Sequence, residues 1–191
     1  MPRTQRSRLA GRLLVAMPGI EDPRFERSVI YLCVHDPDQA MGIAVNRPIE
    51  GLPIAELLKR LGVEPTADVA QGLVLMGGPV EPERGFVLHT DDYAHEATSL
   101  VVGGGVVLTA TREILEALAG DGPAPRRATM ALGYAGWSGG QLERELKENV
   151  WLVCDADEAL LFDDDHEHKW SRALAKLGVA AERLSTQSGR A

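Results

Sequence analysis

The chain has 191 residues, of which 45% are hydrophobic and 25% are charged, as is typical of one globular domain with its own core. Its formal net charge of −8 repels phosphate backbones, so composition argues against direct nucleic-acid binding. Two cysteines, Cys33 and Cys154, are too few for a disulfide scaffold, and no apolar run approaches the roughly 20 residues of a membrane span. We therefore expect a soluble, cytoplasmic protein.

The ends of the chain differ in composition from its middle. Arginines crowd the N-terminus at positions 3, 6, 8 and 12, which is typical of a solvated basic arm. We expect a mobile arm over residues 1–10, a single domain over residues 11–179, and a flexible tail over residues 180–191.

Short runs rich in apolar and β-branched residues predict most of the strands. The run 28–34 predicts a buried strand, and the turn residues Asp36, Pro37 and Asp38 make the run 41–45 its hairpin partner, ending at Arg47-Pro48. The remaining predicted strands are residues 13–17, 73–76, 86–88, 128–132 and 150–154, with two more around the glycines 103–105.

Apolar residues at helical spacing predict the helices. Asp22 followed by Pro23 predicts one capped turn, and Pro53 opens a helix that presents Ile54, Leu57, Leu58 and Leu61 on one face. Three more helices are predicted: one from Arg112 with Ile114, Leu115 and Leu118 inward, one capped by Ser138 and Gln141, and one with Trp170, Leu174 and Leu177 on one face. Because the predicted strands come in adjacent pairs, the sequence favours a mixed α+β domain over a regular βαβ repeat.

Many short motifs, in the same order, resemble those of the YqgE/AlgH family of small bacterial proteins over roughly positions 12 to 178. They are Leu14-Val15-Ala16-Met17-Pro18, Asp22-Pro23, Phe25, Arg27-Ser28-Val29-Ile30-Tyr31, His35, Met41-Gly42, Asn46-Arg47-Pro48, Gly77-Gly78-Pro79-Val80, Arg84-Gly85-Phe86-Val87-Leu88-His89, Gly133-Tyr134, Trp137, Gly140-Gln141-Leu142-Glu143, Trp151-Leu152 and Trp170. The chain departs from the family pattern at Val34, where an acidic residue is usual, and at Thr111, where serine is common.

The resemblance implies a compact α+β domain with a split, partly barrel-like sheet, mostly antiparallel and flanked by short helices. It also implies a largely uncharacterised family. One branch carries a name linked to transcriptional control of alginate synthesis, without a recognisable DNA-binding module. A regulator that acts through protein contacts is therefore one functional hypothesis.

The run Gly136-Trp137-Ser138-Gly139-Gly140 matches the G-x-S-x-G pattern of serine hydrolases, and Asp155 and His166 follow in hydrolase order. A nucleophile elbow places its serine directly at the end of a strand, whereas here 134–137 separate Ser138 from the predicted strand. We favour a helix cap with loop-shaping glycines and keep a serine hydrolase using Ser138 as an alternative.

Other motifs give no support for a metal or a cofactor. The acidic and histidine-rich run 163–168 lacks the alternation and mid-loop glycine of a calcium loop, so we expect capping and surface roles for it. Cys33 and His35 are predicted to share one strand face, but two ligands do not make a zinc site. The glycines 103–105 complete no dinucleotide or phosphate-binding loop.

Six polar residues at or beside strand ends remain as the best candidate ligand-binding set: Arg27, His35, Asn46, Arg47, Arg84 and His89. Arginines next to such turns present forked donors to carboxylate or phosphate. Their alternative role is to pair with Asp22, Glu81 or Glu83 and fix the loops. The sequence favours a non-enzymatic binding or regulatory module for a small anion or a protein partner.

Overall fold

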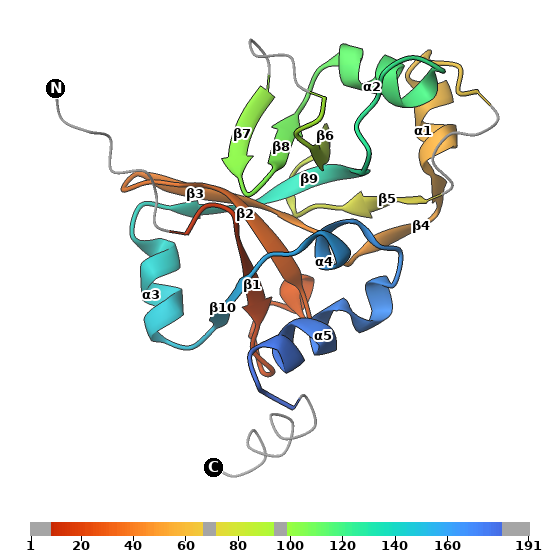
Figure 1. Ribbon diagram of the computed structural model, residues 1–191. Helices are drawn as coiled ribbons and strands as arrows, with labels where there is room; N and C mark the ends of the chain where they lie inside the picture. The colour runs from red at the N-terminus through yellow and green to blue at the C-terminus, as the bar shows by residue number, and fades with distance from the viewer. Residues whose placement is uncertain (1–8, 67–71, 94–98, 181–191) are drawn as a thin grey trace, which may run out of the picture.

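The computed structural model describes residues 9–66, 72–93 and 99–180, which form a curved sheet with short helices around it (Figure 1). The predicted N-terminal arm and C-terminal tail lie almost wholly outside these residues and stay predictions. The strands are β1 (Arg12–Ala16), β2 (Val29–His35), β3 (Gln39–Ala44), β4 (Pro48–Pro53), β5 (Leu73–Met76), β6 (Val80–Thr90), β7 (Ser99–Gly103), β8 (Val106–Thr109), β9 (Ala128–Ser138) and β10 (Trp151–Asp155). The α-helices are α1 (Ile54–Arg60), α2 (Arg112–Ala119), α3 (Gln141–Lys147), α4 (Glu158–Phe162) and α5 (Lys169–Lys176), and single 3-10 turns form η1 (Pro23–Phe25) and η2 (His166–His168).

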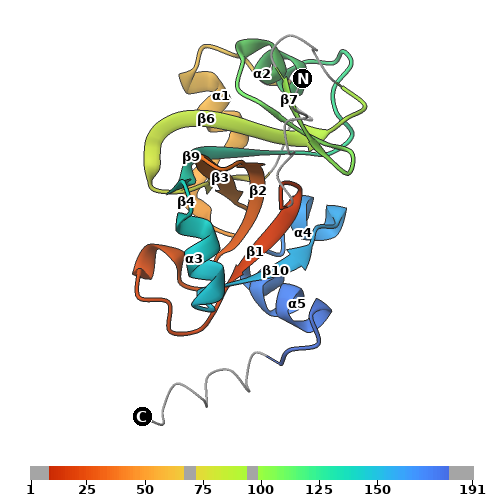
Figure 2. The same cartoon turned by 90° about the vertical axis from the view of Figure 1, so that its left-hand side faces the viewer.

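The strands follow the order β10-β1-β2-β3-β9-β6-β8-β7, and β4 and β5 pair with each other beside this path. The pairing of β5 with β9 is parallel and the other described pairings are antiparallel. Figure 2 shows the long strand β6 curving across the upper half of the molecule, beneath α1 and α2, while β1 and β10 lie nearer α5. The predicted α+β domain with a mixed, mostly antiparallel, partly barrel-like sheet is confirmed.

After Arg12, strand β1 is apolar because both of its faces are covered. Leu13 and Val15 belong to the core beneath α4 and α5, which includes Trp170 and Leu174. The alternate residues Leu14 and Ala16 belong to a second core on the α3 side. Since side chains alternate along a strand, a run that feeds two cores is continuously hydrophobic.

Helices α1 and α2 cover a third core at the other end of the sheet. Ile54, Leu57 and Leu58 of α1 are buried there together with Ile114 of α2. Leu61 was predicted to share this buried face. It lies just after the last residue of the helix, Arg60, and it is 44% exposed. The apolar periodicity therefore predicts the correct face, except at the last position.

The motif Gly77-Gly78-Pro79 joins β5 to β6 at a point where its backbone passes very close to the backbone of β9. A Cβ atom on Gly77 would collide with the carbonyl oxygen of Gly133 in β9, and one on Gly78 would collide with the backbone of Tyr134. Gly133 itself has a φ of 75°, in the left-handed region that glycine adopts freely. The glycines therefore allow three strands to meet in little space.

Most elements predicted from the sequence are confirmed, but strand lengths and two elements differ. Strands β6 and β9 each have 11 residues, where three and five were predicted. Strand β4 and helix α4 were not predicted: β4 begins at the Pro48 that was expected to end the sheet pairing, and α4 has only five residues. In the described part of the chain, no helix is long and apolar enough to cross a membrane.

Candidate functional site

Three of the six predicted residues line one open cleft, which we call the arginine cleft, of about 690 Å³. It lies between the loop after β1, the turn that joins β3 to β4, and the segment formed by η2 and the start of α5. Its lining residues are Met17, Pro18, Gly19, Glu26, Arg27, Asn46, Arg47, His166, Glu167, His168, Trp170 and Ser171.

Asn46 braces one wall of the arginine cleft. Its Oδ1 accepts a hydrogen bond from the backbone N–H of Val29 at 2.9 Å, and its Nδ2 donates to the carbonyl oxygen of Arg27 at 2.8 Å. Arg27 has a φ of 55°, a left-handed backbone conformation that is uncommon for residues other than glycine. Asn46 thus holds Arg27 in a conformation that costs energy on its own.

The Arg27 side chain lies across an aromatic ring. Its guanidinium carbon is 5.3 Å from the centroid of Trp170, within the range of a cation–π contact. The ring cannot shift easily, because Trp170 is buried and its Nε1 donates to the carbonyl oxygen of Ala16 at 2.8 Å. The guanidinium is therefore held against the ring at the border of the cleft.

Arg47 is the second guanidinium of the cleft. Its Nη2 donates to the carbonyl oxygen of Glu26 at 2.6 Å, and burial lowers its pKa while the carboxylates of Glu26 and Asp22 act in the opposite direction. Among the described residues, no carboxylate forms an ion pair with Arg27 or with Arg47. In the described structure, both cations therefore keep N–H donors that no carboxylate occupies.

The opposite wall carries two histidines with different environments. Burial lowers the pKa of His166, and its Nδ1 is buried without a hydrogen-bond partner among the described residues. His168 is exposed, and its Nδ1 lies 2.7 Å from Asp165, which raises the pKa of the imidazole. The predicted surface role of this acidic run is confirmed for Asp164 and Asp165, which are exposed, but the capping role is wrong, because neither η2 nor α5 has a side-chain cap bond. Asp163 instead pairs with Arg172 at 2.7 Å. Within the described ranges, no group of three or more His, Cys, Asp or Glu side chains is arranged so that it could hold a metal ion.

The other three predicted residues lie elsewhere. His35 approaches Glu143 of α3 with its Nε2 at 2.6 Å, and Arg84 lies over Phe86 and 3.4 Å from Glu81 in a separate cleft. His89 is fully buried, and both of its ring nitrogens are occupied, by the carbonyl oxygen of Thr90 and by Thr109 Oγ1. The structure thus brings Arg27, Asn46 and Arg47 together and separates them from the other three.

The prediction that Cys33 and His35 share a strand face is wrong. The pairing of β2 with β3 shifts by one residue between Leu32 and Val34, so Cys33 sits in a bulge. Cys33 and Val34 both pack toward the core that holds Trp170, while His35 contacts α3 on the other side. The bulge removes the geometric basis for a Cys–His ligand pair.

The prediction that Ser138 caps α3 is also wrong. The residue at the N-cap position is Gly140, with a φ of 77°, and Ser138 is the last residue of β9. The backbone N–H of Ser138 donates to Gln141 Oε1 at 3.1 Å, so the glutamine half of the expected capping box forms without the serine half, and Ser138 Oγ donates to the same oxygen at 3.3 Å. In the described part of the chain, no histidine is hydrogen-bonded to Ser138, as a catalytic triad requires.

A second cleft of about 760 Å³ lies on the other side of the loop that follows β1. Its central carboxylate, Glu145, accepts hydrogen bonds from the indole nitrogens of Trp137 and Trp151, each at 2.8 Å, and from Gln141 at 3.0 Å. Glu21 and Glu148 also line it. Its surplus of carboxylates makes it a poorer anion site than the arginine cleft.

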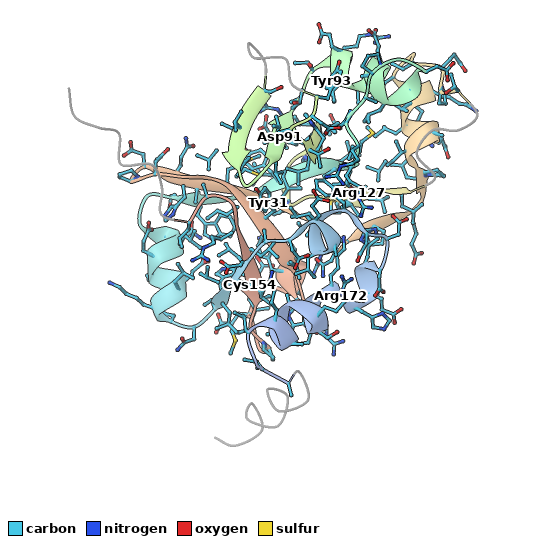
Figure 3. All side chains as sticks on the ribbon, in the orientation of Figure 1. Tyr31, Asp91, Tyr93, Arg127, Cys154 and Arg172 are labelled. Atoms are coloured by element: carbon cyan, nitrogen blue, oxygen red, sulfur yellow. The ribbon has the colours of Figure 1, made fainter. Side chains whose placement is uncertain are left out.

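Sequence reasoning missed the residues of η2 and α5 that form the far wall. Trp170 was assigned to an inward helix face, and nothing local in the sequence places its ring beneath Arg27. Helix α5, which carries both Trp170 and the Arg172 labelled in Figure 3, lies at the lower end of the molecule in that view. Neither of the two histidines in this wall was predicted to face the candidate arginines. Only the tertiary fold brings these segments together.

Comparison with known proteins gives one consistent family. A family model described as AlgH-like matches residues 13–182. A UPF0301 protein of Caulobacter vibrioides is 65% identical over 183 residues, covering 96% of this chain and 94% of its own length. A UPF0301 protein of Rhodospirillum rubrum is 50% identical over 184 residues, covering 96% of this chain and 94% of its own length.

Two solved structures share the fold. The solution structure of the AlgH protein from Pseudomonas aeruginosa matches with a TM-score of 0.76 and 40% identity, covering 100% of both chains. A crystal structure of a protein from Corynebacterium diphtheriae matches with a TM-score of 0.69 and 20% identity, covering 90% of this chain and 89% of that one. At that identity the second match speaks for the fold alone.

Proposed function

The chain belongs to the AlgH-like family, and we propose that it is a non-enzymatic binding module whose arginine cleft holds an anionic group, a carboxylate or a phosphate. The observation that carries this proposal is the pair of guanidiniums, Arg27 and Arg47, that border one open cleft without a carboxylate partner among the described residues. Most other described arginines are neutralised, as Arg24 is by Asp22 and Arg126 is by Glu158.

The geometry of the two cations supports anion binding of useful strength. The Trp170 ring and the Glu26 carbonyl oxygen already fix Arg27 and Arg47, so less side-chain freedom is lost when a ligand binds. Hydrogen bonds from a guanidinium to a carboxylate or phosphate are charge-assisted and stronger than neutral ones. The partial burial of Arg47 strengthens its interaction with an anion further.

The charge of the chain limits the kind of anion. Glu26 and Glu167 also border the cleft, and the whole chain carries a net charge of −8. A compact anion can approach the guanidiniums closely, whereas an extended nucleic-acid backbone meets the surrounding negative field. We therefore propose a small anion, and no direct nucleic-acid partner. We also place the protein in the cytoplasm, since both of its cysteines are free thiols.

A regulatory role through protein contacts is the second candidate, and it uses the same cleft. An aspartate or glutamate of a partner protein offers the same carboxylate to Arg27 and Arg47. A serine hydrolase using Ser138 is the least supported of the three, because the hydroxyl bonds to Gln141 and lacks a histidine partner in the described structure.

The proposal is tested by replacing Arg47 with alanine and measuring phosphate and acetate binding by calorimetry. Losing a charge-assisted hydrogen bond costs roughly 1.5–3 kcal/mol, so affinity is expected to fall on the order of tenfold to a hundredfold. Arg84→Ala is the matched control, because Arg84 came from the same predicted set but lies in a different cleft. Equal losses of affinity in the two variants, or a lower melting temperature of Arg47→Ala with unchanged binding, would show that Arg47 only stabilises the loop and does not bind the anion.

A further inference from the structure

Lys169, the first residue of α5, is a lysine without solvent exposure. Its Nζ donates a hydrogen bond to the carbonyl oxygen of Val45 at 2.9 Å and lies 4.0 Å from Asp163 Oδ1. Lysines are almost never fully buried, because removing an ammonium from water is costly unless it is paired. One hydrogen bond to a carbonyl oxygen, with the nearest described carboxylate 4.0 Å away, leaves this cation incompletely compensated.

The position of Lys169 ties it to both walls of the arginine cleft. His168 and Trp170, its neighbours in the chain, line one wall, and Val45 directly precedes Asn46 and Arg47 of the other. The hydrogen bond from Lys169 to Val45 therefore joins the two walls behind the cleft. A buried charge there is screened by salt much less than a charge on the surface.

Several charged groups act on this ammonium from the elements around it. Asp163, Asp164 and Asp165 come from the loop before η2, Arg172 comes from α5, and His166 comes from η2. Arg27, Arg47 and Glu26 line the cleft itself. Burial lowers the pKa of Lys169 to about 8, and Asp163 opposes that change. The proton is therefore present at neutral pH and is lost on mild alkalinisation.

We propose that Lys169 is a positioning and charge-supplying residue for the arginine cleft, and that anion binding there is strong only while its buried ammonium keeps its proton. The inference rests on the proposed anion-binding function and adds its regulation by pH. A bound anion stabilises the nearby positive charge, so binding and protonation favour each other by linkage. At an effective dielectric constant of about 20, a unit charge about 10 Å from an anion changes its affinity on the order of tenfold.

Stability and affinity should move in opposite directions above neutral pH, which separates this effect from simple unfolding. The folded pKa of Lys169 lies below its unfolded value, so between about pH 8 and 10 the unfolded chain binds more protons than the folded chain. The contribution of this group to stability therefore rises with pH in that window. Affinity for the anion is expected to fall over the same window.

The test follows sulfate binding by calorimetry from pH 6.5 to 9.5, because sulfate does not titrate there. In the unchanged protein, affinity should fall about tenfold as pH rises through about 8. In Lys169→Met, affinity should be weaker at pH 7 and nearly independent of pH above 8. Lys59→Met, which removes an exposed lysine from α1, should behave like the unchanged protein.

The possible outcomes distinguish this inference from the proposed function. Affinity that stays flat up to pH 9.5, while Arg47→Ala still weakens binding, overturns the role of Lys169 and leaves the anion site standing. A slope that persists unchanged in Lys169→Met also overturns it and points to His168. An absence of sulfate binding at every pH overturns both. Where Lys169→Met fails to fold, a pH slope that survives in His168→Gln supports the role of Lys169, and a slope that is lost in His168→Gln overturns it.

Discussion

Arg27 combines an unfavourable backbone conformation with an immobilised side chain. Its left-handed φ of 55° is held by the hydrogen bond from Asn46, and its guanidinium is held by the Trp170 ring. A non-glycine residue in this region costs on the order of 1 kcal/mol, so the surrounding contacts must outweigh that cost. Such an arrangement is typical of a side chain whose position matters more than its local energy.

The two cysteines lead to a prediction about thiol chemistry. Burial raises the pKa of Cys33 to about 12 and also raises the pKa of Cys154. At pH 8 only about one Cys33 in ten thousand is then a thiolate, the reactive form. We expect both thiols to react with a disulfide reagent only as fast as the protein unfolds, and at once in concentrated urea. Rapid modification of Cys33 in the folded protein would show a reactive or metal-binding role instead.

At the scale of single elements, helix α3 begins differently from the expectation, and this changes a mutational prediction. Gly140 at the N-cap has a φ of 77°, so Gly140→Ala should cost about 1 kcal/mol of unfolding free energy through backbone strain. Ser138→Ala removes one exposed hydrogen bond to Gln141 and should cost less than about 0.5 kcal/mol. Urea unfolding of the two variants measures both values. A larger loss for Ser138→Ala than for Gly140→Ala would restore Ser138 as the cap.

The elements that the sequence predicts well are those whose signal is local. The buried run of β2 and the apolar face of α1 follow from residue pattern alone. Strands β6 and β9 extend beyond their apolar runs because they pair with each other across a register shift between Val80 and Gly85, where Gly133, with its φ of 75°, allows a close backbone approach. Helix α4 is too short for a periodic pattern, although Asp157 caps it by accepting from the N–H of Leu160.

The sequence predicts only one of the two walls of the arginine cleft. Arg27 lies just before β2, and Asn46 and Arg47 lie just after β3, so the predicted hairpin of these two strands brings them together. Arg84 belongs to β6, on the far side of β9, and His89 points into the interior, which motif spacing does not reveal. The wall formed by η2 and α5 depends on long-range contacts such as the bond from Lys169 to Val45.

For the whole molecule, the balance between a local cationic cleft and a global negative charge sets the range of partners. The chain has 20 Lys and Arg residues against 28 Asp and Glu residues. Beyond one Debye length, about 8 Å at physiological salt, an approaching ligand senses little of a single charge pair. The arginine cleft therefore acts on ligands that enter it, while the net charge disfavours large polyanions that must lie along the surface.

This balance predicts that one preparation of the protein binds phosphate or sulfate but does not retard duplex DNA at 150 mM salt. A protein that neutralises several phosphates gains affinity steeply as salt falls, because each contact releases counterions. Here the arginine cleft offers two guanidiniums without an ion-pair partner among the described residues, with Glu26 and Glu167 beside them, so few such contacts can form. Gel-shift titrations from 20 to about 200 mM salt, with sulfate calorimetry as the control for intact protein, make the measurement. DNA binding with a steep salt dependence that Arg47→Ala abolishes would contradict the prediction and make the cleft a backbone-phosphate site.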